Sequence, residues 1–245
     1  MHFDYELTDK LGTRATIGLV TLQSDETIEH DMRRMLPLDG VAFYVSRVES
    51  APEVTEETLA RMESHLTGSA RLFPLPAEFD AVGYGCTSGT SVIGAARVAE
   101  MIVAGCRTAA VTEPLSALIA ACEHLGVKRL AFLSPYVEEV SATLRAAVNR
   151  AGIETPVFGS FNEENEDAVA RIAPQSIIAA AEALAAKGGF DALFMSCTNL
   201  RTLDVIEEIE DRIGVPVLSS NQVLGWHLCR LSGISMAGRF GRLTA

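Results

Sequence analysis

Short apolar segments rich in β-branched residues alternate along the chain with longer segments of helical spacing. Residues 15–21 (ATIGLVT) are typical of a buried strand, and the Ala-rich residues 174–187 of a helix. The predicted strands cover residues 15–21, 40–45, 81–84, 109–112, 129–133, 156–161, 192–195 and 216–218, and the predicted helices cover residues 28–35, 55–66, 91–104, 114–125, 137–151, 174–187, 203–213 and 221–231.

Strands that alternate with helices in this way indicate an α/β fold, with parallel sheets covered by helices on both faces. The pattern restarts near residue 114, where Gly126–Leu130 enters a strand as Gly12–Thr16 does earlier. We therefore expect two similar Rossmann-like or flavodoxin-like units, related by a pseudo-twofold axis, with the active site between them. The predicted first unit is residues 1–113 plus 217–245, and the predicted second unit is residues 114–216.

Two segments half a chain apart are near copies of each other. Residues 80–87 read DAVGYGCT and residues 191–198 read DALFMSCT, so Cys86 and Cys197 each follow a predicted strand. Ligands of open α/β sheets bind beyond the carboxyl ends of the strands. Helix N-termini in such loops bind anions, and we expect them to lower the pKa of both thiols. Two thiols that face each other across a cleft can transfer protons on both faces of a carbon.

Charge and composition narrow the possible partners. A net charge of −12 over 245 residues disfavours binding to nucleic acid or to anionic membranes. The N-terminal residues resemble no secretory signal, and no apolar run is long enough to span a membrane. The odd number of cysteines, five, indicates reduced thiols, and without a CxxC pair a zinc site is not expected. We expect a cytoplasmic homodimer or higher homo-oligomer that needs no metal or cofactor.

Four motifs of the chain are similar to those of the aspartate/glutamate racemase superfamily. They are GYGCTSGT around Cys86, SCTNLRT around Cys197, LSPY ending at Tyr136, and GVPVLSSNQVLGWH near the C-terminus. The likeness spans about residues 14–235. It is greatest for the branch that contains maleate cis-trans isomerase and arylmalonate decarboxylase, which implies an enzyme that acts on a small carboxylate.

The resemblance also implies roles for individual residues. Cys86 matches the cysteine that attacks or deprotonates the substrate, and Cys197 matches the acid on the opposite face. Tyr136 matches a tyrosine that hydrogen-bonds a substrate carboxylate. Asn165 matches a substrate-binding asparagine, with Asn162 as the alternative, although the acidic run 162–167 by itself indicates a solvated loop and the start of a helix. The loops that cradle carboxylates are matched by Thr87, Ser88, Thr198 and Asn199.

Asp25 departs from the maleate isomerase pattern, which has an asparagine at this place after the first strand. An ionised aspartate only accepts hydrogen bonds, so it would repel a dicarboxylate and suit a substrate with an ammonium or amide donor. The same residue can cap the helix at 28–35. This N-terminal segment also resembles the racemase-like branch of ectoine-utilisation proteins.

Three activities and one binding function remain open from the sequence. Maleate-to-fumarate isomerisation is the leading prediction, because both cysteines are present. An aspartate/glutamate-type racemase is the first alternative. An arylmalonate-type decarboxylase, which keeps only the second cysteine, is another, and a non-catalytic binder of small acids is the last. Ser220 and Asn221 could cap the last helix or line the pocket, and we favour the capping role.

Overall fold

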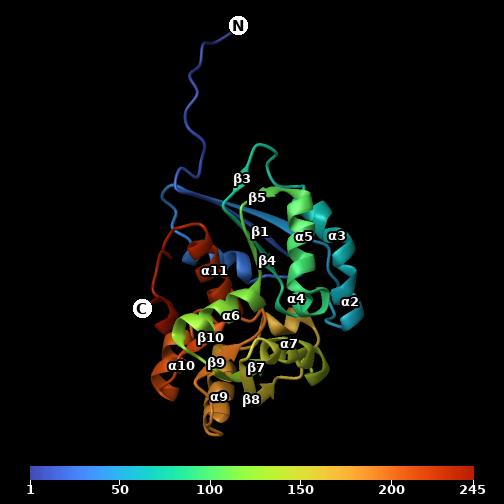
Figure 1. Ribbon diagram of the computed structural model, residues 1–245, viewed down its shortest axis with the longest axis vertical. Coiled ribbons are helices and arrows are strands. Elements are labelled where there is room, and N and C mark those ends of the chain that lie inside the picture. Colours follow the sequence, from blue (N-terminus) through green and yellow to red (C-terminus); the bar gives the residue numbers. More distant parts are fainter.

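The computed structural model describes the backbone of residues 1–245 and every side chain except that of Glu56. Two four-stranded parallel sheets form its two halves (Figure 1). The first sheet has the order β2-β1-β4-β6, with β1 (Ala15–Leu22), β2 (Val41–Val48), β4 (Ala81–Gly85) and β6 (Val111–Thr112). The second sheet has the order β8-β7-β9-β10, with β7 (Arg129–Ser134), β8 (Glu154–Ser160), β9 (Ala192–Met195) and β10 (Val217–Ser219). A short parallel pair joins β3 (Glu78–Phe79) to β5 (Arg107–Thr108).

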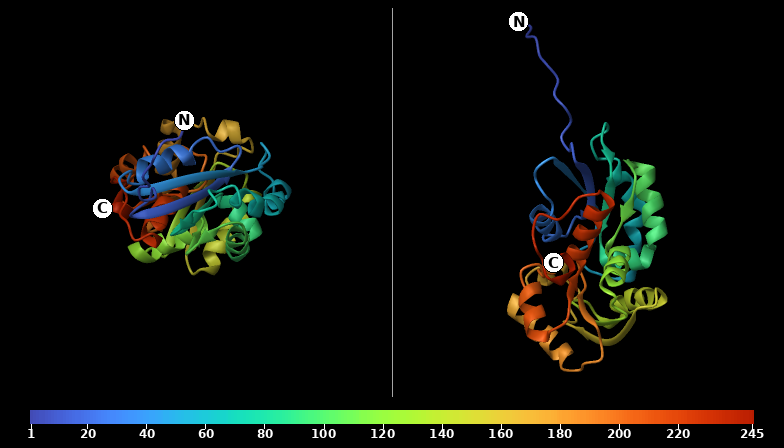
Figure 2. Two further views of the ribbon diagram at one scale, coloured as in Figure 1. Left: turned by 90° about the horizontal axis from the view of Figure 1, so that it is seen from above. Right: turned by 60° about the vertical axis from the view of Figure 1, so that its left-hand side comes forward.

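Helices cover both sheets (Figure 2). Two predicted helices differ from the observed ones. The segment 55–66 forms two helices, and the segment 91–104 begins earlier and is interrupted at Gly94, whose φ of +93° cannot continue a helix. The helices are α1 (Ile28–Met35), α2 (Glu56–Arg61), α3 (Glu63–Ala70), α4 (Thr87–Ile93), α5 (Ala95–Gly105), α6 (Pro114–Leu125), α7 (Glu138–Arg150), α8 (Glu166–Val169), α9 (Pro174–Ala185), α10 (Ile206–Ile213), α11 (Ser220–Leu231) and the 3₁₀ turn η1 (Arg242–Thr244).

The predicted parallel α/β fold with two similar units is confirmed, since the strand orders of the two sheets correspond one to one. The acidic residue that begins each copied segment has the same structural role in both units. The carboxylate of Asp80 accepts from the Thr16 N–H at 2.8 Å, and that of Asp191 accepts from the N–H groups of Lys128 and Arg129 at 2.9 Å. Each aspartate thereby fixes the start of the neighbouring strand, which aligns the two central strands of its sheet.

The units exchange one helix each. Helix α6 follows β6 of the first sheet, but its Leu118 packs with Phe132 in the core beneath the second sheet. Helix α11 follows β10 of the second sheet, and its Leu224 packs in the core with Leu19 of the first sheet. Val223 and Trp226 of the same helix pack with Phe132 in the other core, so α11 contacts both halves.

The C-terminal segment is divided between the units differently from the predicted boundaries. The sequence places residues 217–245 in the first unit, but β10 pairs with β9 to complete the second sheet, and Leu243 packs in the second core. We propose that the first unit consists of residues 1–113 and α11, and that the second consists of residues 114–219 and the C-terminal turn. No described helix has the length and apolar character needed to cross a membrane.

A tight contact between α3 and α5 yields a stability test. A Cβ on Gly105 would lie 2.5 Å from the Ala70 Cβ, whereas a Cβ on Gly68 in α3 would meet no atom within 4 Å. Gly105→Ala should lower the free energy of unfolding by about 1–3 kcal/mol through overpacking. The matched variant Gly68→Ala should raise it by about 0.5–1 kcal/mol. Urea unfolding measures both, and equal effects of the two variants would contradict this close packing of α3 against α5.

Candidate active site

Cys86 lies between the end of β4 and the start of α4, with only 5% of its surface exposed. Its extended backbone makes it the N-cap of α4, and its Sγ accepts a hydrogen bond from the Gly89 N–H at 3.1 Å. Ser, Thr, Asp or Asn usually fills this position, because a side-chain oxygen satisfies the free N–H groups of the first turn. A sulfur atom here is a poor cap, and its use favours a chemical role for the thiol.

Cys197 follows β9 and has a φ of +96°, a strained value for a residue other than glycine. Its N–H donates to Ser220 Oγ at 3.0 Å, and its Sγ accepts from the Asn199 N–H at 3.3 Å. The Tyr136 hydroxyl lies 2.8 Å from the same Sγ. Strain of this kind persists only where surrounding contacts enforce it, and it is concentrated at functional sites.

The two cysteines line one small cavity, where the carboxyl ends of the two sheets meet. Three hydroxyl-bearing residues from the two cysteine loops line it as well, and so does Tyr136. The apolar part of its wall comes from the first unit. The lining residues are Leu22, Val54, Leu59, Cys86, Thr87, Ser88, Tyr136, Glu166, Cys197 and Thr198.

Glu166 is a member of the site that the sequence pattern did not reveal. Only 4% of its surface is exposed, although an acidic run such as 162–167 predicts a solvated loop. Its Oε1 accepts from the Tyr136 hydroxyl at 2.7 Å and its Oε2 from the Asn199 amide at 2.8 Å. The available signal was helical spacing, since buried Val169 and Ala170 lie three and four residues further on.

The structure does not place Asn165 in the cavity. This side chain is exposed and caps α8, where its Oδ1 accepts from the N–H groups of Asp167 and Ala168. The alternative residue, Asn162, is also exposed. The one-residue shift occurs because the helix begins directly after Asn165, which turns Glu166 inward instead.

Asp25 is buried, with 3% of its surface exposed, and lies at the start of α1. Its Oδ1 accepts from the N–H groups of Thr27 and Ile28, both at 2.8 Å, so it caps this helix, which is one of its two expected roles. Its Oδ2 is buried and has no hydrogen-bond partner among the described residues. Burial raises the pKa of Asp25, against hydrogen bonds from Ile28, Thr198 and Thr27 and the charge of Arg47. Asp25 does not line the cavity.

The loop residues Asn199 and Ser220 hold the site together. The Asn199 Oδ1 accepts from the Glu26 N–H at 2.9 Å, so this amide joins the Asp25 loop to Glu166 and does not line the cavity. The Thr87 hydroxyl donates to Ser220 Oγ at 2.9 Å, which bridges the loops of both cysteines. The expected capping role belongs to Ser219 instead.

Both thiols have a raised pKa, contrary to the lowering expected from the helix N-terminus. Burial raises the pKa of Cys86 to about 12, and the charge of Glu166 acts in the same direction against the Gly89 N–H. Burial also raises the pKa of Cys197 well above its ordinary value, and Glu166 adds to this. Exclusion of water and nearby carboxylates thus outweigh the hydrogen bonds to sulfur.

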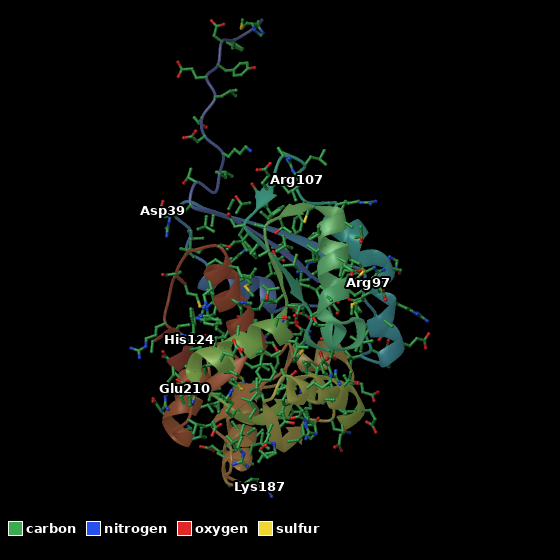
Figure 3. All side chains as sticks on the ribbon, in the orientation of Figure 1. Asp39, Arg97, Arg107, His124, Lys187 and Glu210 are labelled. Carbon is green, nitrogen blue, oxygen red and sulfur yellow. The ribbon has the colours of Figure 1, made fainter. Side chains whose placement is uncertain are left out.

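Positive charge is absent from the cavity wall. Among the residues that the structure describes, no Lys, Arg or His side chain lines the cavity. Figure 3 shows Arg97, Arg107 and Lys187 on the outside of the molecule. Within the same described set, no group of three or more His, Cys, Asp and Glu side chains is placed to hold a metal ion.

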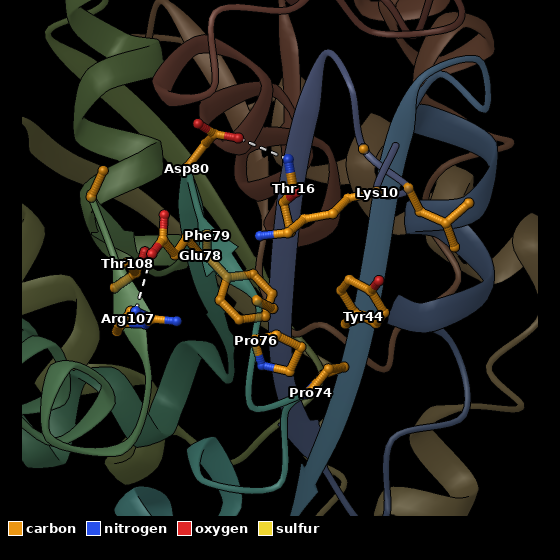
Figure 4. A pocket seen from close by; sticks show the side chains of 14 residues that line it. Lys10, Thr16, Tyr44, Pro74, Pro76, Glu78, Phe79, Asp80, Arg107 and Thr108 are labelled. Carbon is orange, nitrogen blue, oxygen red and sulfur yellow. Dashed lines mark hydrogen bonds and ion pairs between the residues drawn. The ribbon is translucent and has the colours of Figure 1, made fainter. Parts of the chain in front are cut away.

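A wider pocket lies at the opposite end of the first sheet (Figure 4). Thr16 at the start of β1 and Asp80 just before β4 line it, so it lies at the amino ends of the strands. The Arg107 guanidinium pairs there with Glu78 at 3.1 Å. Catalytic sites of parallel sheets lie at the carboxyl ends, so the cavity between the cysteines is the candidate active site.

Comparisons with known proteins agree with this placement. The model of the family described as arylmalonate decarboxylase matches residues 91–244. Arylmalonate decarboxylase of Bordetella bronchiseptica is 31% identical over 131 residues, which cover 52% of this chain and 55% of that enzyme. Maleate isomerase of Geobacillus stearothermophilus is 25% identical over 218 residues, which cover 83% of this chain and 86% of the relative.

A solved structure of the maleate cis-trans isomerase of Nocardia farcinica has the same fold. It is a cysteine-to-serine variant with a covalently bound succinylcysteine intermediate. It superposes with a TM-score of 0.83 at 24% identity, over 94% of this chain and 98% of that chain. The resemblance inferred from the motifs is confirmed by these matches.

The raised thiol pKa gives a direct test. Since thiolate is the reactive form, alkylation of Cys86 by iodoacetamide should rise about tenfold per pH unit from pH 7 to 9.5 without a plateau. Mass spectrometry of the labelled peptide measures the rate. In urea-unfolded protein the same cysteine should level off near pH 9. A plateau near neutral pH in the folded protein would show that the thiol pKa is lowered instead.

Proposed function

Because the chain belongs to the arylmalonate decarboxylase family, we propose that it is a cofactor-independent isomerase that acts on a small carboxylate through Cys86 and Cys197. The observation that carries the proposal is that both thiols line one cavity, at the carboxyl ends of two facing parallel sheets. The maleate isomerase relatives favour cis-trans isomerisation within this class.

In the proposed reaction Cys86, as a thiolate, adds to one carbon of a double bond next to a carboxylate. The electron pair of the double bond moves toward the carboxylate, and the Cys197 S–H protonates the second carbon. Rotation about the new single bond follows. Cys197 then removes a proton from the second carbon, the C–S bond breaks, and the trans product leaves. The succinylcysteine seen in the Nocardia enzyme is the kind of intermediate that this scheme requires.

The surroundings of each thiol suit these steps. The Tyr136 hydroxyl, 2.8 Å from Cys197 Sγ, stabilises negative charge on that sulfur after it has given up its proton. The Ser88 hydroxyl can donate to the substrate carboxylate. The hydroxyls of Thr87 and Thr198 line the same cavity and donate to Ser220 Oγ and to the Gly85 carbonyl. Burial excludes water, which strengthens these interactions and protects the intermediate. The two thiols supply the chemistry, so the scheme needs no metal or organic cofactor.

Racemisation of an amino acid is the second candidate. In this case one cysteine removes the α-proton and the other donates a proton to the opposite face. The observation that favours it is the pair of buried carboxyl groups, Asp25 and Glu166, beside the thiols. We further propose that the protein, with all five cysteines free, works in the cytoplasm as a homo-oligomer.

The cysteine pair gives the decisive test. Cys86→Ser and Cys197→Ser should each lower turnover by at least about 10³-fold, because a hydroxyl is a far weaker nucleophile and acid than a thiol. The matched control is Cys106→Ser, which changes a half-buried cysteine outside the cavity and should retain activity. Turnover is followed by proton NMR in D2O with maleate, L-aspartate, L-glutamate and 2,4-diaminobutyrate in separate tubes.

Each reaction class gives its own spectrum. Fumarate from maleate indicates cis-trans isomerisation, and loss of an α-proton signal without a new compound indicates racemisation. Carbon dioxide from a phenylmalonate tube would indicate the decarboxylase alternative. Full activity of either active-site cysteine variant would contradict the two-thiol scheme.

A further inference from the structure

Two hydrogen-bond contacts join Cys197 to a carboxyl group inside the cavity. The Tyr136 hydroxyl lies 2.8 Å from Cys197 Sγ and 2.7 Å from Glu166 Oε1. All three residues line the cavity, and none is more than 4% exposed. A hydroxyl carries one proton, so Tyr136 donates to one of these neighbours while it accepts from the other. Two arrangements of the protons are therefore possible, a thiol with a carboxylate or a thiolate with a carboxylic acid.

The structure fixes Glu166 at the end of this series. Its Oε2 accepts from the Asn199 amide at 2.8 Å, and the oxygen of the same amide accepts from the Glu26 N–H at 2.9 Å. Burial raises the pKa of Glu166 against the hydrogen bonds from Tyr136 and Asn199, and the charge of Asp25 acts in the same direction as burial. A raised pKa makes the carboxylate a stronger base than one in water.

Cys86 has no comparable connection to a base. The Tyr84 hydroxyl, which acts on the Cys86 thiol, faces the thioether sulfur of Met62 at 3.7 Å. Cys86 Sγ also accepts from the Gly89 N–H. A thioether is a weak acceptor, and an N–H group accepts no proton. Among the described residues, no base is therefore hydrogen-bonded to Cys86 directly or through Tyr84, although the segments that carry the two cysteines are near copies.

We propose that Glu166 serves as the base of Cys197 through a proton relay that passes the Tyr136 hydroxyl. The Cys197 S–H gives its proton to the Tyr136 oxygen, while the Tyr136 O–H gives its own proton to Glu166 Oε1. The products are a thiolate, an unchanged tyrosine and a carboxylic acid, and the reverse transfer restores the thiol. One negative charge is present before and after, so burial opposes this transfer less than it opposes loss of the proton to water.

The relay rests on the proposed function and deepens it, because it gives the two cysteines different surroundings for different roles. A thiolate at Cys197 is the form that removes a proton from carbon, in isomerisation as in racemisation. Glu166 is a positioning residue in this reaction, since it acts on the sulfur through Tyr136. The residue that carries the relay is thus the glutamate of the acidic run, which the motifs did not indicate.

Alkylation by iodoacetamide tests the relay without a substrate, because thiolate is the reactive form. Between pH 7 and 9.5, alkylation of Cys197 should level off in the wild-type protein, since its rate stops rising once Glu166 is ionised. Cys86 in the same sample should continue to rise about tenfold per pH unit, because burial raises its pKa and no base assists it. Mass spectrometry of the two labelled peptides measures both rates.

Glu166→Gln should change the two cysteines in opposite directions. It removes the base of Cys197, so alkylation of this thiol at pH 7 should slow at least about 10²-fold and lose its plateau. It also removes a negative charge that raises the pKa of Cys86, so Cys86 should react faster. If Glu166 acted only through its charge, both cysteines would react faster in this variant.

Tyr136→Phe interrupts the same relay and keeps the aromatic ring. It should also remove the plateau of Cys197, and the double variant with Glu166→Gln should be no slower than the slower single variant. The control is Glu210→Gln, which alters a buried carboxyl group that accepts from the Val217 N–H and does not line the cavity. It should leave both alkylation rates unchanged.

The outcomes decide the relay separately from the proposed function. Wild-type Cys197 that rises tenfold per pH unit like Cys86, or that stays unlabelled while Cys86 reacts, would overturn the relay, because both thiols line the same cavity. Faster alkylation of Cys197 in a folded Glu166→Gln protein would also overturn it. If that variant unfolds, both cysteines will level off near pH 9, and the wild-type and Tyr136→Phe profiles decide. A confirmed relay in a protein that keeps full turnover after Cys197→Ser would support the inference and refute the proposed two-thiol chemistry.

Discussion

The site depends on one constraint, which is that the carboxyl ends of two parallel sheets face each other across a small cavity. Cys86 and Cys197 each lie just beyond a strand, so strand register determines their positions. Asp80 and Asp191 fix that register from the far end of each sheet. At the cavity, Ser220 joins the loops of both cysteines, so the two thiols are placed by backbone geometry and by one shared hydroxyl.

The sequence was sufficient for the features that local patterns encode. The strand periodicity and the copied Cys-Thr segments predicted the parallel sheets and the meeting of Cys86 with Cys197, because strand ends in this fold converge by rule. The sequence did not predict that Glu166 is buried in the site. An acidic run is typical of a solvated segment, and only the folded chain shows that Glu166 contacts Tyr136. The sequence also did not predict which sheet α6 and α11 pack against, because an amphipathic pattern does not specify which sheet a helix covers.

The pKa values of the two thiols in the cavity depend more on exclusion of water than on the helix N-terminus. The partial charge at the start of a short helix contributes about 0.3–1 kcal/mol. Two unit charges 4 Å apart interact by about 4 kcal/mol at an effective dielectric constant of about 20. Burial, with the nearby carboxyl groups as a smaller cause, therefore dominates and raises the pKa of both thiols.

The exchange of α6 and α11 has a consequence for how the molecule folds and opens. The larger core contains residues of both sheets, among them Leu19 and Leu133, and α6 and α11 each pack against the sheet to which their preceding strand does not belong. The chain should therefore fold as a single cooperative body despite its internal duplication. The same two chain crossings hold the two sheets together.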